Sequence, residues 1–283
     1  MKFIKLIRFD VRNGICRNIG LLLSPAVISV LSFVDFSRKF YQLELIEASA
    51  VGTVPTYADY IMYIYGGMTQ YIPNPADPFQ FPAIWMIWFM SLLYFMSSYA
   101  YKDMQTVGIQ LLTRSGSRLL WWMSKTVWCF IGTLLFHAVI WLTVCIGCVV
   151  TKADLTFTLH TDSICRLFQT FSTGSAMGIA DIPTIILLLP VVVSFAFSLG
   201  QMTLSLFIKP MFSYLSMAVT VILSTYIFSP MLLCNYAMLI RSELFMSNGV
   251  NAYTGYAYAA IVVLFLTLFG ARVFYSYDVI NRE

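Results

Sequence analysis

The side chains that could do chemistry in this sequence lie mostly inside long apolar runs. His137 is the one titratable group, other than Cys and Tyr, that falls near the middle of such a run. An ionisable residue at membrane depth is a functional candidate by default, yet a neutral imidazole can also simply hydrogen-bond a neighbouring helix. The sequence leaves both roles open for His137, and we favour the structural one.

Two later apolar runs carry stripes of hydroxyl and amide side chains at three- and four-residue spacing. The members are Ser194, Ser198, Gln201 and Ser205 in the first run and Ser213, Ser216, Thr220 and Ser224 in the second. This spacing places each set on one face of a helix. Small hydroxyl residues commonly permit close helix packing, which is the favoured interpretation. The alternative is a path for an amphipathic substrate, lined by Ser194, Ser198, Gln201, Ser216, Thr220 and Ser224.

Catalytic and nucleotide-binding motifs are not found in the sequence. It has no G-x-x-x-x-G-K-[ST] loop to cradle phosphates, no H-E-x-x-H and no G-x-S-x-G, and its six cysteines show no metal-ligand spacing. We therefore expect no enzyme activity, metal or cofactor in this chain itself. The middles of the apolar runs also lack Asp, Glu, Lys and Arg, which argues against an autonomous ion-coupled transporter.

The composition indicates a membrane protein. The 283 residues are 59% hydrophobic and 11% charged, whereas a soluble domain is typically about 25% charged. Runs of ~20 apolar residues match the hydrocarbon thickness of a bilayer, and without period-2 alternation they must be helices. The sequence therefore predicts an all-α polytopic membrane protein, with six transmembrane helices at about 19–36, 82–100, 126–150, 182–207, 212–233 and 257–276.

An amphipathic helix is expected ahead of the first span. Residues 1–18 are predicted to form a cytoplasmic elbow helix, in front of a six-helix transmembrane domain over 19–283. Its cations fall within an arc of roughly 120° at 100° per residue, which suits a helix lying along the inner leaflet. These cations are Lys2, Lys5, Arg8 and Arg12.

The distribution of Lys and Arg predicts the side that each loop faces. With the N-terminus in the cytoplasm, twelve of the 17 cations lie inside, namely Lys2, Lys5, Arg8, Arg12, Arg17, Lys102, Arg114, Arg118, Lys125, Lys209, Arg272 and Arg282. The other five, outside, are Arg38, Lys39, Lys152, Arg166 and Arg241. Since cations favour cytoplasmic loops, both termini of this cell-membrane protein are predicted to be cytoplasmic. Topology thus explains the net charge of +4 without nucleic acid.

This orientation fixes the predicted loops. A long Tyr-rich loop lies outside at 37–81, and its aromatic residues suit a membrane-interface belt. A basic loop lies in the cytoplasm at 101–125. The outer segment 234–256 either re-enters the membrane or stays at the surface, and the sequence leaves both open.

The stretch "LLTRSGSRLLWWMSK", residues 111–125, places three cations between two runs that are long enough to cross a bilayer. On charge alone it would be a topology signal. It also resembles the first cytoplasmic loop of permease subunits of the type-2 ABC exporter family, at Leu112, Arg114, Ser117, Arg118 and Lys125. In that family the loop forms a coupling helix that inserts into a groove on a separate ATPase. Many members have a proline where this loop has Ser115 and Gly116.

The resemblance extends to the elbow helix, the six spans, the long first outer loop and the cytoplasmic ends. It implies that the ATPase-coupling residues are Arg114, Ser115, Gly116, Ser117 and Arg118. The chain would then be the permease subunit of an ATP-driven exporter. Its partners would be two copies of a separate ABC ATPase, which bind ATP and Mg, a second copy of this chain or a related permease, and membrane lipids.

The substrate implied by this family is amphipathic, such as a peptide antibiotic, a drug or a lipid-like molecule expelled from a bacterial membrane. Such export is one route to antibiotic resistance. The alternative function is a non-transporting membrane sensor or immunity subunit, which would recognise a ligand through its outer loops.

Overall fold

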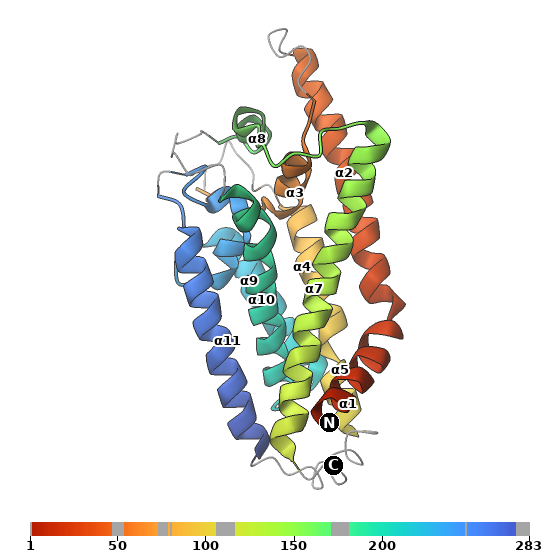
Figure 1. Ribbon diagram of the computed structural model, residues 1–283. Helices are drawn as coiled ribbons and strands as arrows, with labels where there is room; N and C mark the ends of the chain where they lie inside the picture. The colour runs from red at the N-terminus through yellow and green to blue at the C-terminus, as the bar shows by residue number, and fades with distance from the viewer. Residues whose placement is uncertain are drawn as a thin grey trace.

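The protein is a bundle of long helices. The computed structural model describes residues 2–46, 54–72, 79, 81–105, 117–170, 181–246 and 248–275. Figure 1 shows α1 (Lys2–Asp10) and the last turn of α11 (Ala252–Tyr275) at one end, which we call the α1 end. The opposite end carries α3 (Tyr57–Tyr65) and α8 (Thr161–Leu167), and we call it the α8 end. The described residues form no strand, only two isolated bridges.

Five described helices are long and apolar enough to cross a membrane. They correspond to the first four predicted spans and the last one, so the all-α class is confirmed and the fold suits a polytopic membrane protein. The first candidate span, Ile19–Leu43, lies within α2 (Ile19–Ile46), and the second, Ala83–Gln105, covers α4 (Ala83–Ser97) and α5 (Tyr99–Gln105). The other three spans are whole helices, namely α7 (Arg118–Thr151), α9 (Ile182–Leu204) and α11.

The fifth predicted span, 212–233, is shorter than expected. Helix α10 covers Pro210–Tyr226, 17 residues, or about 25 Å against a hydrocarbon core of about 30 Å. Beyond it the chain turns back, because Pro230 cannot continue the helix four residues after Tyr226. The Asn235 side chain then donates to the carbonyls of Ile227 and Ser229. Two 3₁₀ turns follow, η2 (Leu233–Ala237) and η3 (Leu239–Arg241).

The boundaries of the predicted cytoplasmic loop 101–125 are wrong at both ends. Helix α5 continues to Gln105, and α7 begins at Arg118, eight residues before its predicted start. The Ser117 hydroxyl accepts a hydrogen bond from the Leu120 amide, which caps the first turn of α7. The described ends of the loop are therefore helical.

Helix α9 is the core of the bundle and packs against α4, α7, α10 and α11. Most of its side chains are buried, whereas α11 exposes Ile261, Leu264, Phe265 and Leu268 in the manner of a lipid-facing helix. Helix α11 approaches α7 closely at Gly270, where an added Cβ would lie 2.1 Å from the Trp122 ring. Glycine is thus required there to admit the indole.

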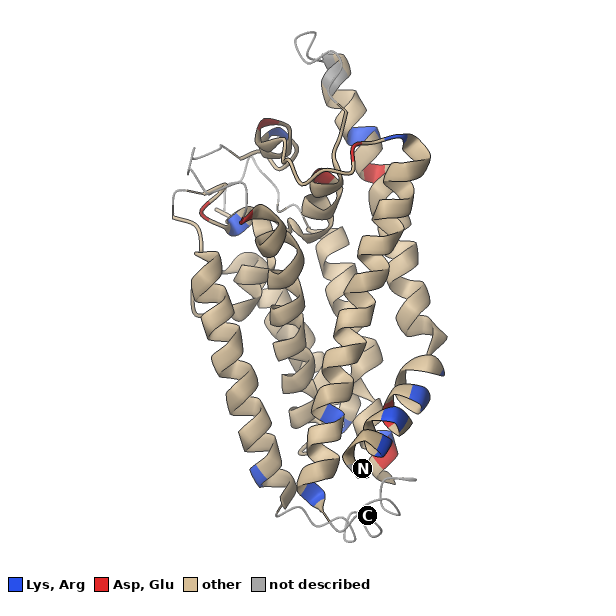
Figure 2. Cartoon of the chain, viewed as in Figure 1, with Lys and Arg blue, Asp and Glu red and all other residues tan. Residues whose placement is uncertain are grey.

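Charged side chains gather at the two ends of the bundle and leave its middle apolar (Figure 2). The elbow predicted for residues 1–18 consists of α1 followed by a π-helical segment, η1 (Val11–Cys16). Gly14 lies there against Trp128 and Tyr99, and an added Cβ would meet both rings at under 3 Å. Close packing, rather than an unusual φ, explains this glycine.

The Tyr-rich segment predicted as an interface loop contains the buried helix α3. Tyr60 and Tyr65 are 2% and 0% exposed, so these rings belong to the core and not to an aromatic belt. Thr56 and Asp59 form a capping box at the start of α3. Asp59 also accepts hydrogen bonds from the His160 backbone and contacts the His160 ring at 2.7 Å, which joins α3 to the chain that follows α7.

Arg241 organises the α8 end of the bundle. Its side chain is fully buried, and all five of its guanidinium N–H donors find oxygen acceptors. Four acceptors are backbone carbonyls at 2.6 to 3.2 Å and the fifth is the Asn235 side chain; they belong to Met68, Thr69, Ser224, Thr225 and Asn235. One side chain thus joins the segment after α3, the end of α10 and the η2–η3 turns.

Burial lowers the pKa of Arg241 to about 10. The group stays cationic at neutral pH even so, because its hydrogen bonds to carbonyl dipoles replace the solvation lost on burial. The sequence placed this cation in an outer loop, and the buried cluster around it was not predicted.

We predict that Arg241→Met lowers the free energy of unfolding by more than about 3 kcal/mol, because five buried acceptors lose their donor at once. Arg241→Lys should recover part of this loss, since an ammonium has three donors and no planar fork. The measurement is the thermal unfolding midpoint in detergent. Arg38→Met is the matched control, because Arg38 is exposed. Equal midpoints for Arg241→Met and this control would contradict the structural role of Arg241.

Candidate functional site

A buried cluster of charges lies at the α1 end of the bundle. Lys125 on α7 pairs with Asp10 of α1, and its Nζ lies 2.7 Å from Asp103 Oδ2 of α5. The three side chains, which we call the Lys125 cluster, are 1 to 5% exposed. A salt bridge this deeply buried is expensive to build and is retained only with further hydrogen bonds.

Those further hydrogen bonds are present. Ser124 donates to Asp10 Oδ2 at 2.9 Å and Tyr99 donates to Asp10 Oδ1 at 3.0 Å. Trp121 donates its indole N–H to Asp103 Oδ2 at 3.2 Å. The ammonium of Lys125 also lies 4.7 Å from the ring centre of Tyr99 and 5.0 Å from that of Trp121, within range of a cation–π interaction.

The Lys125 cluster contains two carboxylates and one cation. Burial raises the pKa of Asp10 above its usual range, despite the opposing effect of Lys125 and of three hydrogen-bond donors. The cluster therefore holds charge in place at the junction of α1, α5 and α7, and it contains no nucleophile poised for catalysis.

The Lys125 cluster flanks the loop that the sequence singled out. Of the predicted coupling residues, Arg114, Ser115 and Gly116 lie outside the described residues. Ser117 caps α7, and Arg118 donates from Nη1 to the Tyr275 carbonyl of α11 at 2.7 Å. The two described coupling residues therefore lie where α7 meets α11.

Sequence reasoning missed the Lys125 cluster because it assigned Lys125 to a solvated loop. A signal was present: Lys125 follows two tryptophans and directly precedes the predicted span 126–150, and the residues from Ser117 to Thr126 contain no proline or glycine. Trp121 is buried and stacks on Phe274, with ring centres 4.6 Å apart, so it belongs to the helix packing. A cation that follows such residues on one helix is expected inside the bundle.

The polar stripe of α9 is entirely buried. Ser194, Ser198 and Gln201 are each 0% exposed, and the Ser198 hydroxyl and both amide atoms of Gln201 have no hydrogen-bond partner among the described residues. Ser213 of α10 donates to the Gln201 carbonyl at 2.7 Å, so the two stripes meet at this point. Close packing explains the serines but not the unpaired Gln201 amide.

The stripe of α10 is divided between two faces. Ser224 is buried and its carbonyl accepts from Arg241, whereas Ser216 is exposed and Thr220 is part-exposed. Thr220 donates to the Ser216 carbonyl within the same helix. The structure thus brings Ser194, Ser198 and Gln201 together on α9 and leaves Ser216 and Thr220 on the bundle surface.

His137 is buried between α3 and α9. Its Nδ1 lies 2.7 Å from the Tyr65 hydroxyl and its Nε2 lies 2.9 Å from the Ser194 hydroxyl. Ser194 donates its single hydroxyl hydrogen to the Val191 carbonyl, so it accepts from Nε2–H, and Nδ1 accepts from Tyr65. This arrangement satisfies a neutral imidazole and supports the structural role favoured from the sequence.

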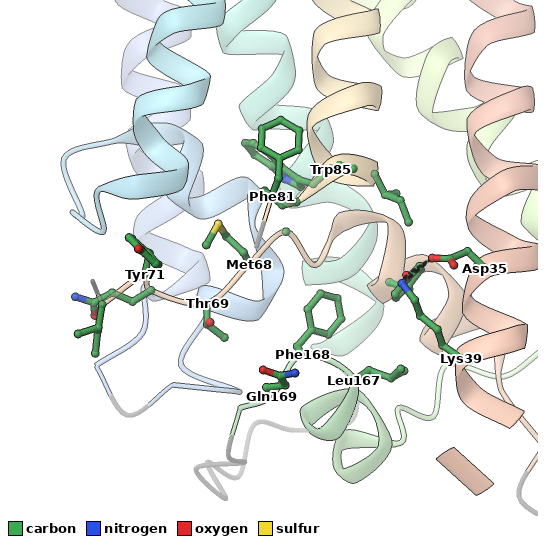
Figure 3. A pocket seen from close by; sticks show the side chains of 17 residues that line it. Asp35, Lys39, Met68, Thr69, Tyr71, Phe81, Trp85, Leu167, Phe168 and Gln169 are labelled. Carbon is green, nitrogen blue, oxygen red and sulfur yellow. Dashed lines mark hydrogen bonds and ion pairs between the residues drawn. The ribbon is translucent and has the colours of Figure 1, made fainter. Parts of the chain in front are cut away.

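A cavity of about 480 Å³ opens at the α8 end (Figure 3). Asp35 and Lys39 of α2 border it, with Nζ and Oδ2 2.8 Å apart, and the Tyr63 hydroxyl bonds both. Burial raises the pKa of Tyr63 to about 12, so its hydroxyl keeps the proton that it donates to Asp35. Apolar lining comes from α4 and from Phe168 after α8.

No family model, curated protein or solved structure matches the chain. Among the described residues there is also no group of three or more His, Cys, Asp or Glu side chains that could hold a metal ion. Three features of the chain therefore bear on its function: the Lys125 cluster, the cavity and the sequence resemblance at 111–125.

We predict that Lys125→Met lowers the free energy of unfolding by about 3–5 kcal/mol, because it leaves two buried carboxylates without a counter-ion. Lys5→Met is the matched control, since Lys5 is an exposed cation on α1 at the same end. A triple variant, Lys125→Met with Asp10→Asn and Asp103→Asn, should recover much of the loss by removing the charges together. The thermal unfolding midpoint in detergent measures all three. A wild-type midpoint for Lys125→Met would show that the cluster does not hold the helices.

Proposed function

We propose that this chain is the membrane-spanning permease subunit of an ATP-driven exporter, and that a separate ATPase acts on it through the loop between α5 and α7. The observation that carries the proposal is the Lys125 cluster. It joins the helix before this loop and the helix after it to the elbow helix α1. A force applied to the loop would therefore move three elements together.

Helix α7 would transmit that movement across the membrane. It has 34 residues without a break, about 50 Å of continuous helix. Past its middle it contacts α3 through the bonds of Tyr57 to the Trp141 carbonyl and of Tyr65 to His137. A tilt of α7 would thus reach the α8 end, as alternating access requires.

The proposed topology places the α1 end in the cytoplasm of a cell membrane. Lysines and arginines gather at that end, on α1, α7 and α11 (Figure 2), and the positive-inside rule favours the cytoplasm for such an end. Helix α10, a shorter apolar helix of 17 residues, would act as the sixth span. The working unit would be two such chains, or one and a related permease, with two ATPases that bind ATP and Mg. The exported substrate would be amphipathic.

A second candidate function is a membrane subunit that senses a ligand and transports nothing. The observation that favours it is the cavity at the α8 end, which lies far from the proposed ATPase contact. The two candidates differ in whether an ATPase binds at the α1 end.

We predict that the ATPase encoded beside the gene co-purifies with the wild-type chain and is lost from the double variant Arg114→Glu/Arg118→Glu, because reversed charges repel carboxylates on the partner. The measurement is the amount of ATPase retained after affinity purification in mild detergent, and the expected loss is tenfold or more. Arg272→Glu is the matched control, since Arg272 is an exposed cation of α11 at the same end.

Wild-type retention in the double variant would assign these arginines to topology alone. The ligand-sensing function would then become the better one. A loss in the double variant and in the Arg272 control alike would indicate attraction by the whole basic surface, not by the loop.

We further predict that Gln201→Leu raises the thermal unfolding midpoint slightly and reduces transport. An unpaired buried amide costs about 1–3 kcal/mol, which an apolar side chain of similar length avoids. Transport should fall if the Gln201 amide hydrogen-bonds the substrate during the transport cycle. The measurement is export of a fluorescent amphipathic dye from vesicles with the ATPase present. Met202→Leu is the control. Wild-type export by Gln201→Leu would remove Gln201 from the proposed path.

A further inference from the structure

Helix α1 attaches to the rest of the bundle through two buried side chains, Leu6 and Asp10, which are 7% and 1% exposed. The other side chains from residue 3 to residue 9 are exposed or half-buried. Leu6 supplies apolar contact, whereas Asp10 bonds to Tyr99 on α5 and to Ser124 and Lys125 on α7. The attachment of α1 therefore depends on the state of one carboxyl group.

The connection between α1 and α2 allows α1 to move separately. Segment η1 is π-helical, and residues 17–18 form a turn before α2 begins. Segments of π-helix are rare and often mark functional sites. Gly14 and Ile15 of η1 are buried, so η1 would stay in place while α1 shifts against α5 and α7.

The Lys125 cluster has one negative charge in excess when all three groups are ionised. Both carboxylates contact the same Nζ atom, so they lie no more than about two hydrogen-bond lengths apart. A buried carboxylate beside a like charge favours binding of a proton, which removes the excess charge.

The other charged groups around α1 do not supply a second buried cation. Among the described residues of α1, η1, the turn before α2, α5 and the first turn of α7, the cations outside the cluster are exposed, where water screens their charge. They are Lys5, Arg8, Arg12, Arg17, Lys102 and Arg118. Asp10 and Asp103 therefore share Lys125 as their buried counter-ion.

The hydroxyl of Ser124 can accommodate a proton on Asp10. Ser124 Oγ lies 2.9 Å from Asp10 Oδ2 and 2.8 Å from the Trp121 carbonyl, but a hydroxyl has one hydrogen to donate. When Asp10 is ionised, Oδ2 accepts that hydrogen. When Asp10 is protonated, its Oδ2–H donates to Ser124 Oγ, and Ser124 donates to the Trp121 carbonyl instead. Asp10 Oδ1 accepts from Lys125 and Tyr99 in both forms.

We infer that the attachment of α1 is a pH-sensitive switch, in which α1 is held most tightly when Asp10 has bound a proton and loosens from α5 and α7 as the pH rises. Burial raises the pKa of Asp10 in the attached position above the usual value of 3.8. The attached form therefore binds the proton at a higher pH than a released, solvated form. This contribution to attachment is complete below the solvated pKa and is lost as the pH rises through the raised one.

The biological consequence of the switch rests on the proposed function. The Lys125 cluster joins α1 to the helices before and after the loop on which an ATPase would act. Loosening of α1 at raised pH would therefore reduce the movement that the loop passes to α1. Proton binding by Asp10 itself needs no ATPase and can be measured on the chain alone.

The test is hydrogen exchange of the α1 backbone amides, measured by mass spectrometry on the full chain in phosphatidylcholine nanodiscs. Wild type and Asp10→Asn are compared at each pH, so that the pH dependence of the exchange chemistry cancels. Asparagine keeps a donor for Ser124 and an acceptor for Lys125, and it has no proton to lose in this range. We expect the protection of α1 in the wild type, relative to Asp10→Asn, to fall by about tenfold or more between about pH 5 and about pH 9, since a pKa difference of one corresponds to a tenfold change in equilibrium.

Two further variants show whether the effect belongs to the Lys125 cluster. Asp162→Asn is the matched control, because Asp162 is an exposed aspartate of α8 at the opposite end, and its α1 exchange should equal that of the wild type at every pH. Asp103→Asn should move the loosening to a lower pH, because it removes the negative charge beside Asp10. A cooperative thermal transition in detergent shows that each variant is folded.

An infrared titration of the wild type gives a readout that does not need Asp10→Asn to fold. We expect the C=O band of one protonated carboxyl group to persist to a higher pH than the bands of the exposed carboxyl groups. Asp103→Asn should move the loss of this band to a lower pH as well.

Two results would overturn the inference. A constant ratio of wild-type to Asp10→Asn protection over the whole pH range would show that Asp10 does not control α1. A ratio that rises with pH would show that the ionised carboxylate holds α1 through its pair with Lys125.

Retention of the ATPase is measured separately, so the two proposals can fail independently. An α1 that loosens with pH in a chain without an ATPase supports the switch and rejects the permease function. An ATPase bound to a chain whose α1 exchange ignores pH supports the permease and rejects the switch.

Discussion

The structure depends on the cost of burying the charge of Lys125. An ammonium taken out of water needs counter-ions and hydrogen-bond acceptors close by, or the fold loses several kcal/mol. Asp10 and Asp103 supply them from two other elements, so α1, α5 and α7 must meet at one point. No single helix supplies both counter-ions of Lys125, so electrostatics specifies how α1, α5 and α7 meet. The apolar contacts elsewhere in the bundle restrict the register of one helix against another less strictly.

The α8 end also buries a cation, Arg241, but stabilises it with carbonyl groups and not with carboxylates. Arg241 has no carboxylate among its hydrogen-bond acceptors in the described part of the chain and depends on backbone carbonyls from two segments, after α3 and at the end of α10, and on the side-chain oxygen of Asn235. Its fork needs five acceptors in fixed directions, so it determines the path of the chain after α3 and after α10 together.

The sequence predicted the helical class and five of the spans because long apolar runs have one solution in a bilayer. It could not predict where polar residues pair. From the sequence, Lys125 and Arg241 were both assigned to solvated loops, since charged side chains normally face solvent and their partners lie far away along the chain. The end of α10 was placed too late for a different reason: the predicted span 212–233 included Pro230, which cannot continue an α-helix. The bonds of Asn235 and Arg241 then hold the turn that follows. The coupling role of Arg114 and Arg118 stays a prediction.

Helix α7 links these two polar ends through a middle without charge. Between Lys125 and the bond of Tyr57 to the Trp141 carbonyl, its one titratable side chain other than cysteine is His137, whose two ring nitrogens are satisfied as a neutral group. A neutral hydrogen-bonded contact can slide or re-form at lower cost than a buried ion pair, because no charge is left unpaired during the movement. The arrangement therefore favours motion in which the α1 end moves as one body with its charges paired, while adjustment occurs around His137. A rigid α1 end and an adjustable contact at His137 would suit a permease that is driven from the α1 end. The same two features would also let a ligand bound at the α8 end change the α1 end.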